Sequence, residues 1–241
     1  SVIGYYTNVQ KIIITISTIT ASLGAVMLPR LVFLWNHNEL DAVKALGGKA
    51  LQLIIVVCIP VSIGIFILAP QIVRVIFGMD FLPCILTLRI FAPFVLISTV
   101  GNLYGTQLLM TFNEEKILLI TVSVGALLNM TMNLFLIPKM EQNGATIASV
   151  VTEALVLCLQ IYFVNKRVKL KCTSHFLKTL FIMMTVMILY LMIVMKFLDN
   201  DISVIVCSIF GSGCIYLILG ILLKNEAILY FVGLIKSKIL S

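Results

Sequence analysis

The residues best placed to do chemistry in this sequence are polar side chains inside long apolar runs. Glu153 lies near the middle of the run over residues 142–165, which contains no other charged residue. A carboxylate inside a membrane is energetically expensive and is a functional-site hypothesis by default. We hypothesise that Glu153 is a proton or cation site. The alternative is a structural carboxyl group that hydrogen-bonds a neighbouring helix.

Stripes of polar residues occur on four of the apolar runs. An α-helix turns about 100° per residue, so residues four or seven apart share a face. Polar groups in hydrocarbon are costly unless paired, so the stripes either bond neighbouring helices or line a wet cavity. Ser and Thr fit the first alternative, because they bond back to their own helix. Asn129, Asn133 and Glu153 fit the second better.

We expect the stripes of Lys11, Asn102, Asn129 and Glu153 to converge on one concave surface. Arg89 either reaches the membrane interface or faces this cavity. The candidate cavity residues are Lys11, Thr15, Thr18, Arg89, Asn102, Asn129, Asn133 and Glu153.

The elements that position these residues are long and apolar. Hydrophobic residues make up 61% of the 241 residues and charged residues 11%, against about 25% charged in a soluble domain. A membrane-spanning helix needs about 20 apolar residues. Seven runs qualify, at residues 12–29, 50–73, 90–113, 117–138, 142–165, 179–195 and 202–223. The sequence therefore predicts an all-α integral membrane protein with about seven transmembrane helices.

The rare residue types give no sign of a metal site or an enzyme. The six cysteines form no CxxC pair, and His37 and His175 fall in predicted loops. We therefore expect no metal, no cofactor and no catalytic residues.

Basic residues predict the orientation. Of the 17 Lys and Arg residues, 12 fall on one side of the predicted membrane and five on the other, and cytoplasmic loops collect such residues. The basic loop 166–178 is thus predicted to be cytoplasmic, as is the C-terminus, where residues 224–241 read as an interfacial helix. This loop is short and lacks interleaved aromatics, so we expect no nucleic-acid partner.

Glycine and proline interrupt the third run. Gly101 and Gly105 have the spacing that allows helices to approach closely. Pro93, and Pro60 in the second run, each predict a kink.

Several segments occur in an order typical of a known family. They are Ile3-Gly4-Tyr5-Tyr6, Met27-Leu28-Pro29-Arg30, Asn129-Met130-Thr131-Met132-Asn133, Leu136-Ile137-Pro138-Lys139 and Gly144-Ala145-Thr146-Ile147-Ala148. In these segments the chain resembles the bacterial polysaccharide or O-antigen flippases of the multidrug/oligosaccharidyl-lipid/polysaccharide exporter superfamily. The resemblance covers roughly residues 1–166.

The resemblance implies the C-terminal lobe of a two-lobed transporter of fourteen helices. Residues 1–166 would form five helices of that lobe and residues 167–223 two further helices. The chain starts at Ser1 and has an odd number of predicted spans, so we expect a missing N-terminal lobe as a partner.

By resemblance, the substrate is an undecaprenyl-diphosphate-linked oligosaccharide moved across the bacterial inner membrane for O-antigen or capsular polysaccharide synthesis, and membrane lipids are the other partners. Lys11 and Arg89 would neutralise phosphate, and Asn and Thr side chains suit sugar hydroxyls. The alternatives are a multidrug exporter of the same superfamily and a membrane-embedded acyltransferase-type enzyme.

Overall fold

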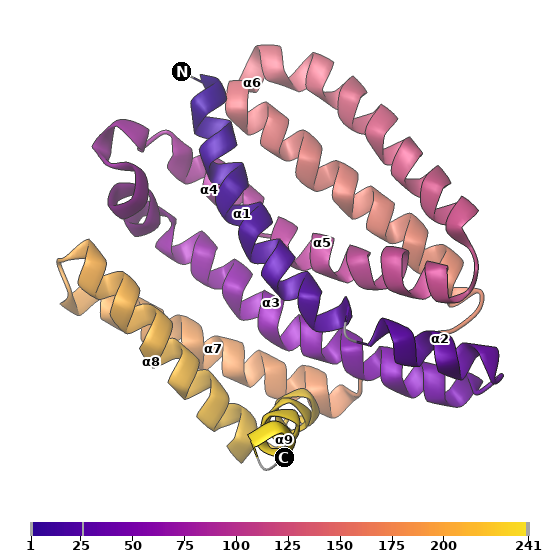
Figure 1. Ribbon diagram of the computed structural model, residues 1–241. Coiled ribbons are helices and arrows are strands. Elements are labelled where there is room, and N and C mark those ends of the chain that lie inside the picture. Colours follow the sequence, from indigo (N-terminus) through magenta and orange to yellow (C-terminus); the bar gives the residue numbers. More distant parts are fainter. Residues whose placement is uncertain (1, 26, 240–241) are drawn as a thin grey trace. The chain divides into compact units, whose positions relative to one another are not determined.

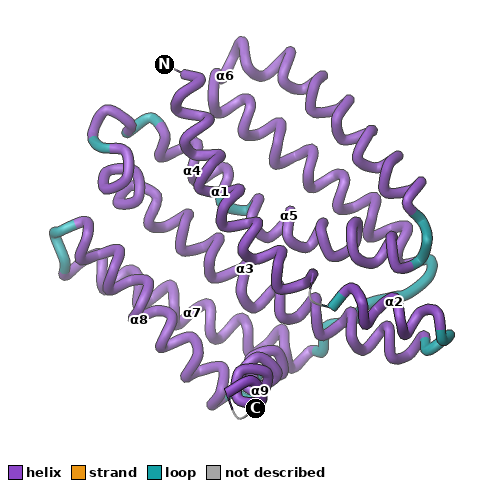
Figure 2. Tube along the Cα trace, viewed as in Figure 1, coloured by secondary structure: helices purple, strands orange, loops and turns teal. Residues whose placement is uncertain are grey.

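The computed structural model describes residues 2–25 and 27–239, with side chains except at residues 2, 3, 23–25 and 234–239. These residues form helices joined by short loops, with no strand among them (Figure 2). The α-helices are α1 (Val2–Ala25), α2 (Leu28–Asn36), α3 (Leu40–Phe77), α4 (Cys84–Phe91), α5 (Phe94–Asn102), α6 (Glu115–Asn165), α7 (Ser174–Phe197), α8 (Asp201–Leu222) and α9 (Glu226–Ile239). Two short elements are the 3₁₀-helix η1 (Met79–Phe81) and the π-helix η2 (Leu103–Leu109).

Five helices within the described residues are long and apolar enough to cross a membrane: α3, the segment Cys84–Leu109, α6, α7 and α8. α6 holds two antiparallel arms, because the chain reverses at Glu141, where φ is 50° and ψ is −127° (Figure 1). α1 covers the first predicted run with 24 residues but is not among the five. The strongly polar residues Asn8, Gln10 and Lys11 near its start lower its mean hydropathy. The predicted all-α membrane architecture is confirmed.

The chain divides into two compact units. Unit 1 comprises Ser1–Phe66 and Pro83–Lys171, and unit 2 comprises Ile67–Leu82 and Cys172–Ser241. α3 therefore contributes its first part to unit 1 and its last part to unit 2. The boundaries at 166 and 223 that the sequence suggests follow transmembrane segments rather than these units, and they stay a prediction.

Unit 1 is built around α1, which packs against α4, α5 and α6. The face of α1 that carries Val9 and Ile13 is fully buried. On the same helix, the Thr20 hydroxyl lies 2.8 Å from the Thr99 hydroxyl of α5. Apolar contacts and one buried polar pair thus hold α1 in place.

The two arms of α6 approach closely at glycines. A Cβ atom on Gly125 would collide with the side chain of Val156 on the opposite arm, and one on Gly144 would collide with the backbone carbonyl of Leu136. Asn143, next to the reversal, accepts a hydrogen bond from Thr87 of α4 at 2.8 Å. The hairpin is therefore fixed by close backbone packing and by a bond to α4.

Unit 2 is centred on α7 and α8, which pack along each other. Leu68, at the end of α3, packs with Val194 and Val204 in an apolar cluster. Arg74 donates two hydrogen bonds to the carboxylate of Asp201 at 2.6 and 2.7 Å. These contacts tie the last turns of α3 to the α7–α8 pair.

The segment after α8 forms a helix, as the sequence predicts. α9 spans Glu226–Ile239, within the segment 224–241 that the sequence reads as an interfacial helix. Asn225 is fully buried, and its side-chain oxygen accepts from the backbone N–H groups of Ala227 and Ile228. This caps the first turn of α9. The side chains of Lys236 and Lys238 lie outside the described residues, and the interfacial position stays a prediction.

Candidate functional site

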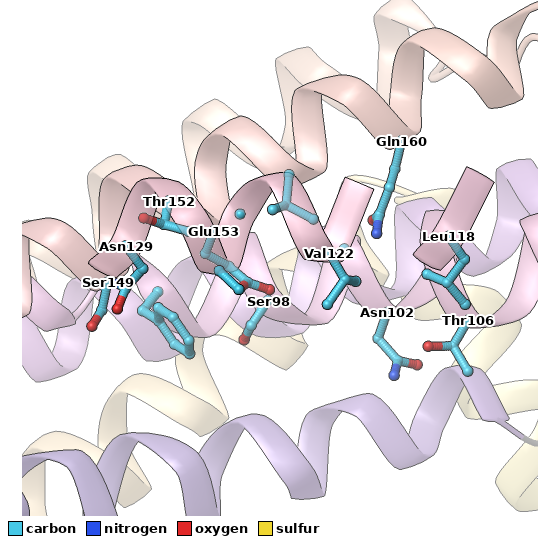
Figure 3. A pocket seen from close by; sticks show the side chains of 15 residues that line it. Ser98, Asn102, Thr106, Leu118, Val122, Asn129, Ser149, Thr152, Glu153 and Gln160 are labelled. Atoms are coloured by element: carbon cyan, nitrogen blue, oxygen red, sulfur yellow. The ribbon is translucent and has the colours of Figure 1, made fainter. Parts of the chain in front are cut away.

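A cavity of about 480 Å³ lies within unit 1. Its walls come from α5 and the start of η2 on one side and from both arms of α6 on the other (Figure 3). The lining residues are Phe94, Ser98, Gly101, Asn102, Thr106, Leu118, Val122, Gly125, Ala126, Asn129, Ser149, Thr152, Glu153, Val156 and Gln160. Thr106 and Val122 are exposed, so the cavity opens at the surface of the unit.

The wall from α5 and η2 is polar because Ser98, Asn102 and Thr106 recur every four residues and face the cavity (Figure 3). Thr99 differs from them, since it is 1% exposed and bonds Thr20 of α1. The polar residues of this segment therefore divide between the cavity and a helix contact.

Glu153 enters the cavity from the second arm of α6. Its Oε1 atom lies 3.5 Å from the point that a Cβ atom would occupy on Gly101, so the carboxylate faces the glycine of α5. No described residue donates a hydrogen bond to this carboxylate, and none forms an ion pair with it. The Glu153 carboxylate therefore faces the cavity and makes no polar contact with a neighbouring helix in the described part of the chain.

Two further oxygen atoms in the cavity wall have no donor among the described residues. Gln160 is 4% exposed and Thr152 is 8% exposed, yet Oε1 of Gln160 and Oγ1 of Thr152 have no hydrogen-bond partner. Buried polar atoms in proteins almost always have a partner. Together with Glu153, these atoms form a wall suited to accepting hydrogen bonds from water or from the hydroxyl groups of a ligand.

Asn129 and Asn133 form a pair on the first arm of α6. Asn133 donates to Oδ1 of Asn129 at 2.9 Å. Asn129 lines the cavity, whereas Asn133 lines a more apolar hollow beside it, which Asn129 also borders. Only one amide of the predicted pair therefore reaches the cavity that Glu153 lines.

Four predicted residues lie away from the cavity. Lys11, Thr15 and Thr18 are exposed on α1, and the two threonines bond back to the carbonyls of Lys11 and Ile14 on their own helix. Arg89 is half-buried, and its Nε donates to the carbonyl of Phe66 at 3.3 Å. The structure thus gathers Asn102, Asn129 and Glu153 around the cavity. The side chains of the four residues above do not line it.

The candidate cavity residues predicted from the sequence include neither Thr152 nor Gln160, although the sequence places Gln160 in the same polar stripe as Glu153. Gln160 carried a usable signal, because it lies seven residues after Glu153 and therefore on the same helical face. Thr152 carried none, since one threonine on a helix more often bonds its own backbone.

The chain is similar to proteins of a known family. The family model described as "Lipid II flippase MurJ" matches residues 1–211. The chain belongs to this family. The prediction of a membrane flippase of the exporter superfamily is therefore confirmed, and the family is MurJ.

Two similar proteins are longer than this chain. An uncharacterised membrane protein of Methanocaldococcus jannaschii is 26% identical over 242 residues, which cover 98% of this chain and 46% of that protein. A solved structure described as lipid II flippase MurJ in an inward closed conformation has a TM-score of 0.72 at 19% identity. The match covers 93% of this chain and 48% of that one, so it shows the MurJ fold, and the chain spans about half the length of both relatives.

Proposed function

We propose that the chain is one lobe of a flippase that moves an isoprenyl-diphosphate-linked saccharide between the leaflets of a membrane. The observation that carries the proposal is the cavity of unit 1, where amide, hydroxyl and carboxylate groups are gathered inside membrane-spanning helices. A diphosphate sugar cannot cross hydrocarbon unaided, whereas such a lining replaces the water around it.

The lining favours a saccharide over a cationic drug. An exporter of cationic compounds would profit from several acids, but Glu153 is the one acidic residue that lines this cavity. Asn102, Asn129 and Gln160 supply amides, which both donate to and accept from sugar hydroxyls. An acyltransferase-type enzyme would use histidine or paired carboxylates for acid–base chemistry, and the lining contains neither.

Two saccharide classes share this chemistry. One is lipid II, the molecule named in the description of the family, and the other is the O-antigen or capsular oligosaccharide unit that the sequence resemblance implied. Both carry a diphosphate, sugars and an isoprenyl chain. We further propose that the protein lies in the bacterial inner membrane, as the sequence resemblance implies, and that its C-terminus is cytoplasmic, as the distribution of basic residues predicts.

Depletion of the full-length protein in its own organism tests the proposal. An isoprenyl-diphosphate-linked precursor should accumulate on the cytoplasmic leaflet, and mass spectrometry of extracted lipids identifies it. A precursor that carries a peptide indicates lipid II, and one that carries a longer glycan indicates the polysaccharide unit. Unchanged amounts of all such lipids would contradict the proposal.

A further inference from the structure

The π-helix η2 is an unusual element at the edge of the cavity. It spans Leu103–Leu109 and follows directly after Asn102, which lines the cavity. A π-helix has i to i+5 hydrogen bonds instead of i to i+4, and such turns within α-helices are frequent at functional sites. The added width of the turn changes which side chains meet along the helix.

The widened turn brings Gln107 to Asn102. Nε2 of Gln107 donates to Oδ1 of Asn102 at 3.1 Å, across a separation of five residues. In a regular α-helix these side chains would point about 140° apart, because five steps of about 100° exceed one full turn by that amount. The contact therefore depends on the π-helical geometry.

Two further features surround the π turn. The Thr111 hydroxyl donates to the backbone carbonyl of Gln107 at 2.7 Å. Gly105 leaves room for the Gln160 carboxamide, whose Nε2 lies 2.6 Å from the point that a Cβ atom would occupy. Thr111, Gln107 and Gln160 are each 4% exposed or less, so these groups lie inside the unit.

We infer that Gln107 is a positioning residue for the cavity and acts through Asn102. Gln107 is 2% exposed and is not part of the cavity wall, so it acts on a ligand only through the residue it holds. Its donor occupies the Asn102 oxygen and fixes the rotamer of that side chain at the cavity wall. If the proposed function is right, the Asn102 amide then contacts the oxygen atoms of a sugar or diphosphate in one fixed orientation.

A double-variant cycle in the full-length protein tests the inference. The variants are Gln107→Leu, Asn102→Ala and their combination, with Gln71→Leu in unit 2 as a matched change of a buried glutamine. Undecaprenyl diphosphate is the probe, and its affinity is read from the shift of the unfolding midpoint. Each single change should weaken binding by about two- to tenfold, as the loss of one hydrogen bond implies.

The combined variant should bind no more weakly than Asn102→Ala alone, and Gln71→Leu should bind as the wild type does. Multiplied effects would overturn the inference, because they show that Gln107 acts independently of Asn102. Unchanged binding in either single variant would overturn it as well.

Hydrogen exchange of the backbone over residues 103–109 tests the same contact without a substrate. Gln107→Leu and Asn102→Ala should raise exchange there to a similar extent, while Gln71→Leu should not. Unchanged exchange in Gln107→Leu would overturn the positioning role. If the variants show this exchange pattern but the wild-type protein does not bind undecaprenyl diphosphate, the positioning role stands and the proposed substrate class is refuted.

Discussion

Arg89 of α4 donates a hydrogen bond from Nε to the backbone carbonyl of Phe66 in α3, at 3.3 Å. The helical partner of that carbonyl would be the N–H group of residue 70, but residue 70 is proline and has none. The Arg89 guanidinium also lies over the Phe66 ring, 5.7 Å from its centroid. Arg89 therefore supplies the hydrogen bond that the backbone of α3 cannot make at Phe66, because Pro70 has no N–H group.

This relationship predicts the effect of removing Arg89. Arg89→Leu leaves the Phe66 carbonyl without its donor and should lower the free energy of unfolding by about 1–3 kcal/mol. In a Pro70→Ala background, the backbone of the substituted residue supplies the missing N–H, so Arg89→Leu should cost less than half as much. Thermal unfolding of the purified full-length protein measures both values, and an equal cost in the two backgrounds would show that Arg89 has another role.

The α6 hairpin predicts that Gly144 tolerates no side chain. A Cβ atom there would overlap the backbone of Leu136, which cannot move aside as a side-chain tip can. Gly144→Ala should lower the free energy of unfolding by about 1–3 kcal/mol. Gly64→Ala is the matched control, because its Cβ would meet nothing within 4 Å. The control should be neutral or slightly stabilising, as alanine is the better helix former, and similar losses in both variants would refute this account of the hairpin.

Cys172 gives a test of orientation and of local electrostatics. It lies in the loop before α7, where burial raises the pKa of its thiol and the Glu226 carboxylate adds to the effect. The thiolate is the reactive form. In a variant that keeps only this cysteine, an impermeant thiol reagent should therefore react slowly near pH 7 and faster above the ordinary thiol pKa of about 8.5.

Glu226→Gln removes the negative charge and should speed the labelling of Cys172 at a given pH. Labelling should occur in inside-out vesicles and not from outside sealed cells, since the loop is predicted to be cytoplasmic. Reaction from outside sealed cells would reverse the predicted topology. An equal labelling rate of Cys172 in the wild type and in Glu226→Gln would show that the Glu226 charge does not affect the thiol.

Glu153 remains our proposed proton or cation site. Glu153→Gln keeps the shape of the side chain and its hydrogen-bonding capacity but cannot take up a proton or balance a cation. In the full-length protein it should strongly reduce the export of lipid-linked saccharide, with nearly unchanged abundance in the membrane. Normal export by Glu153→Gln would make the residue a hydrogen-bonding group only.

Much of the fold could be predicted because charge-free runs are long and bounded by loops. Residues 117–138 and 142–165 correspond to the two arms of α6. The third run is interrupted at Pro93, which separates α4 from α5, whereas the helix of α3 continues through Pro60. The start of α3 at Leu40 was not predicted, because the helix extends into a charged segment beyond the apolar run.

The site could be predicted only in part, because helical periodicity shows which residues share a face but not what that face meets. Asn102, Asn129 and Glu153 were found by this means. Lys11 shares a face with Thr15 and Thr18, but that face is exposed in the structure. The contact between Gln107 and Asn102 could not be predicted, since it depends on a π turn and periodicity assumes an α-helix.

The measurement that tests the central claim most directly is flipping by the full-length protein in proteoliposomes. The substrate is an isoprenyl-diphosphate-linked saccharide with a fluorophore on its sugar, and an impermeant quencher reports the leaflet that holds it. We predict that the wild type moves the fluorophore between leaflets, that Asn102→Ala slows this transfer, and that Gln71→Leu does not. Transfer no faster than in protein-free liposomes would contradict the proposal that the chain forms part of a flippase for such lipids.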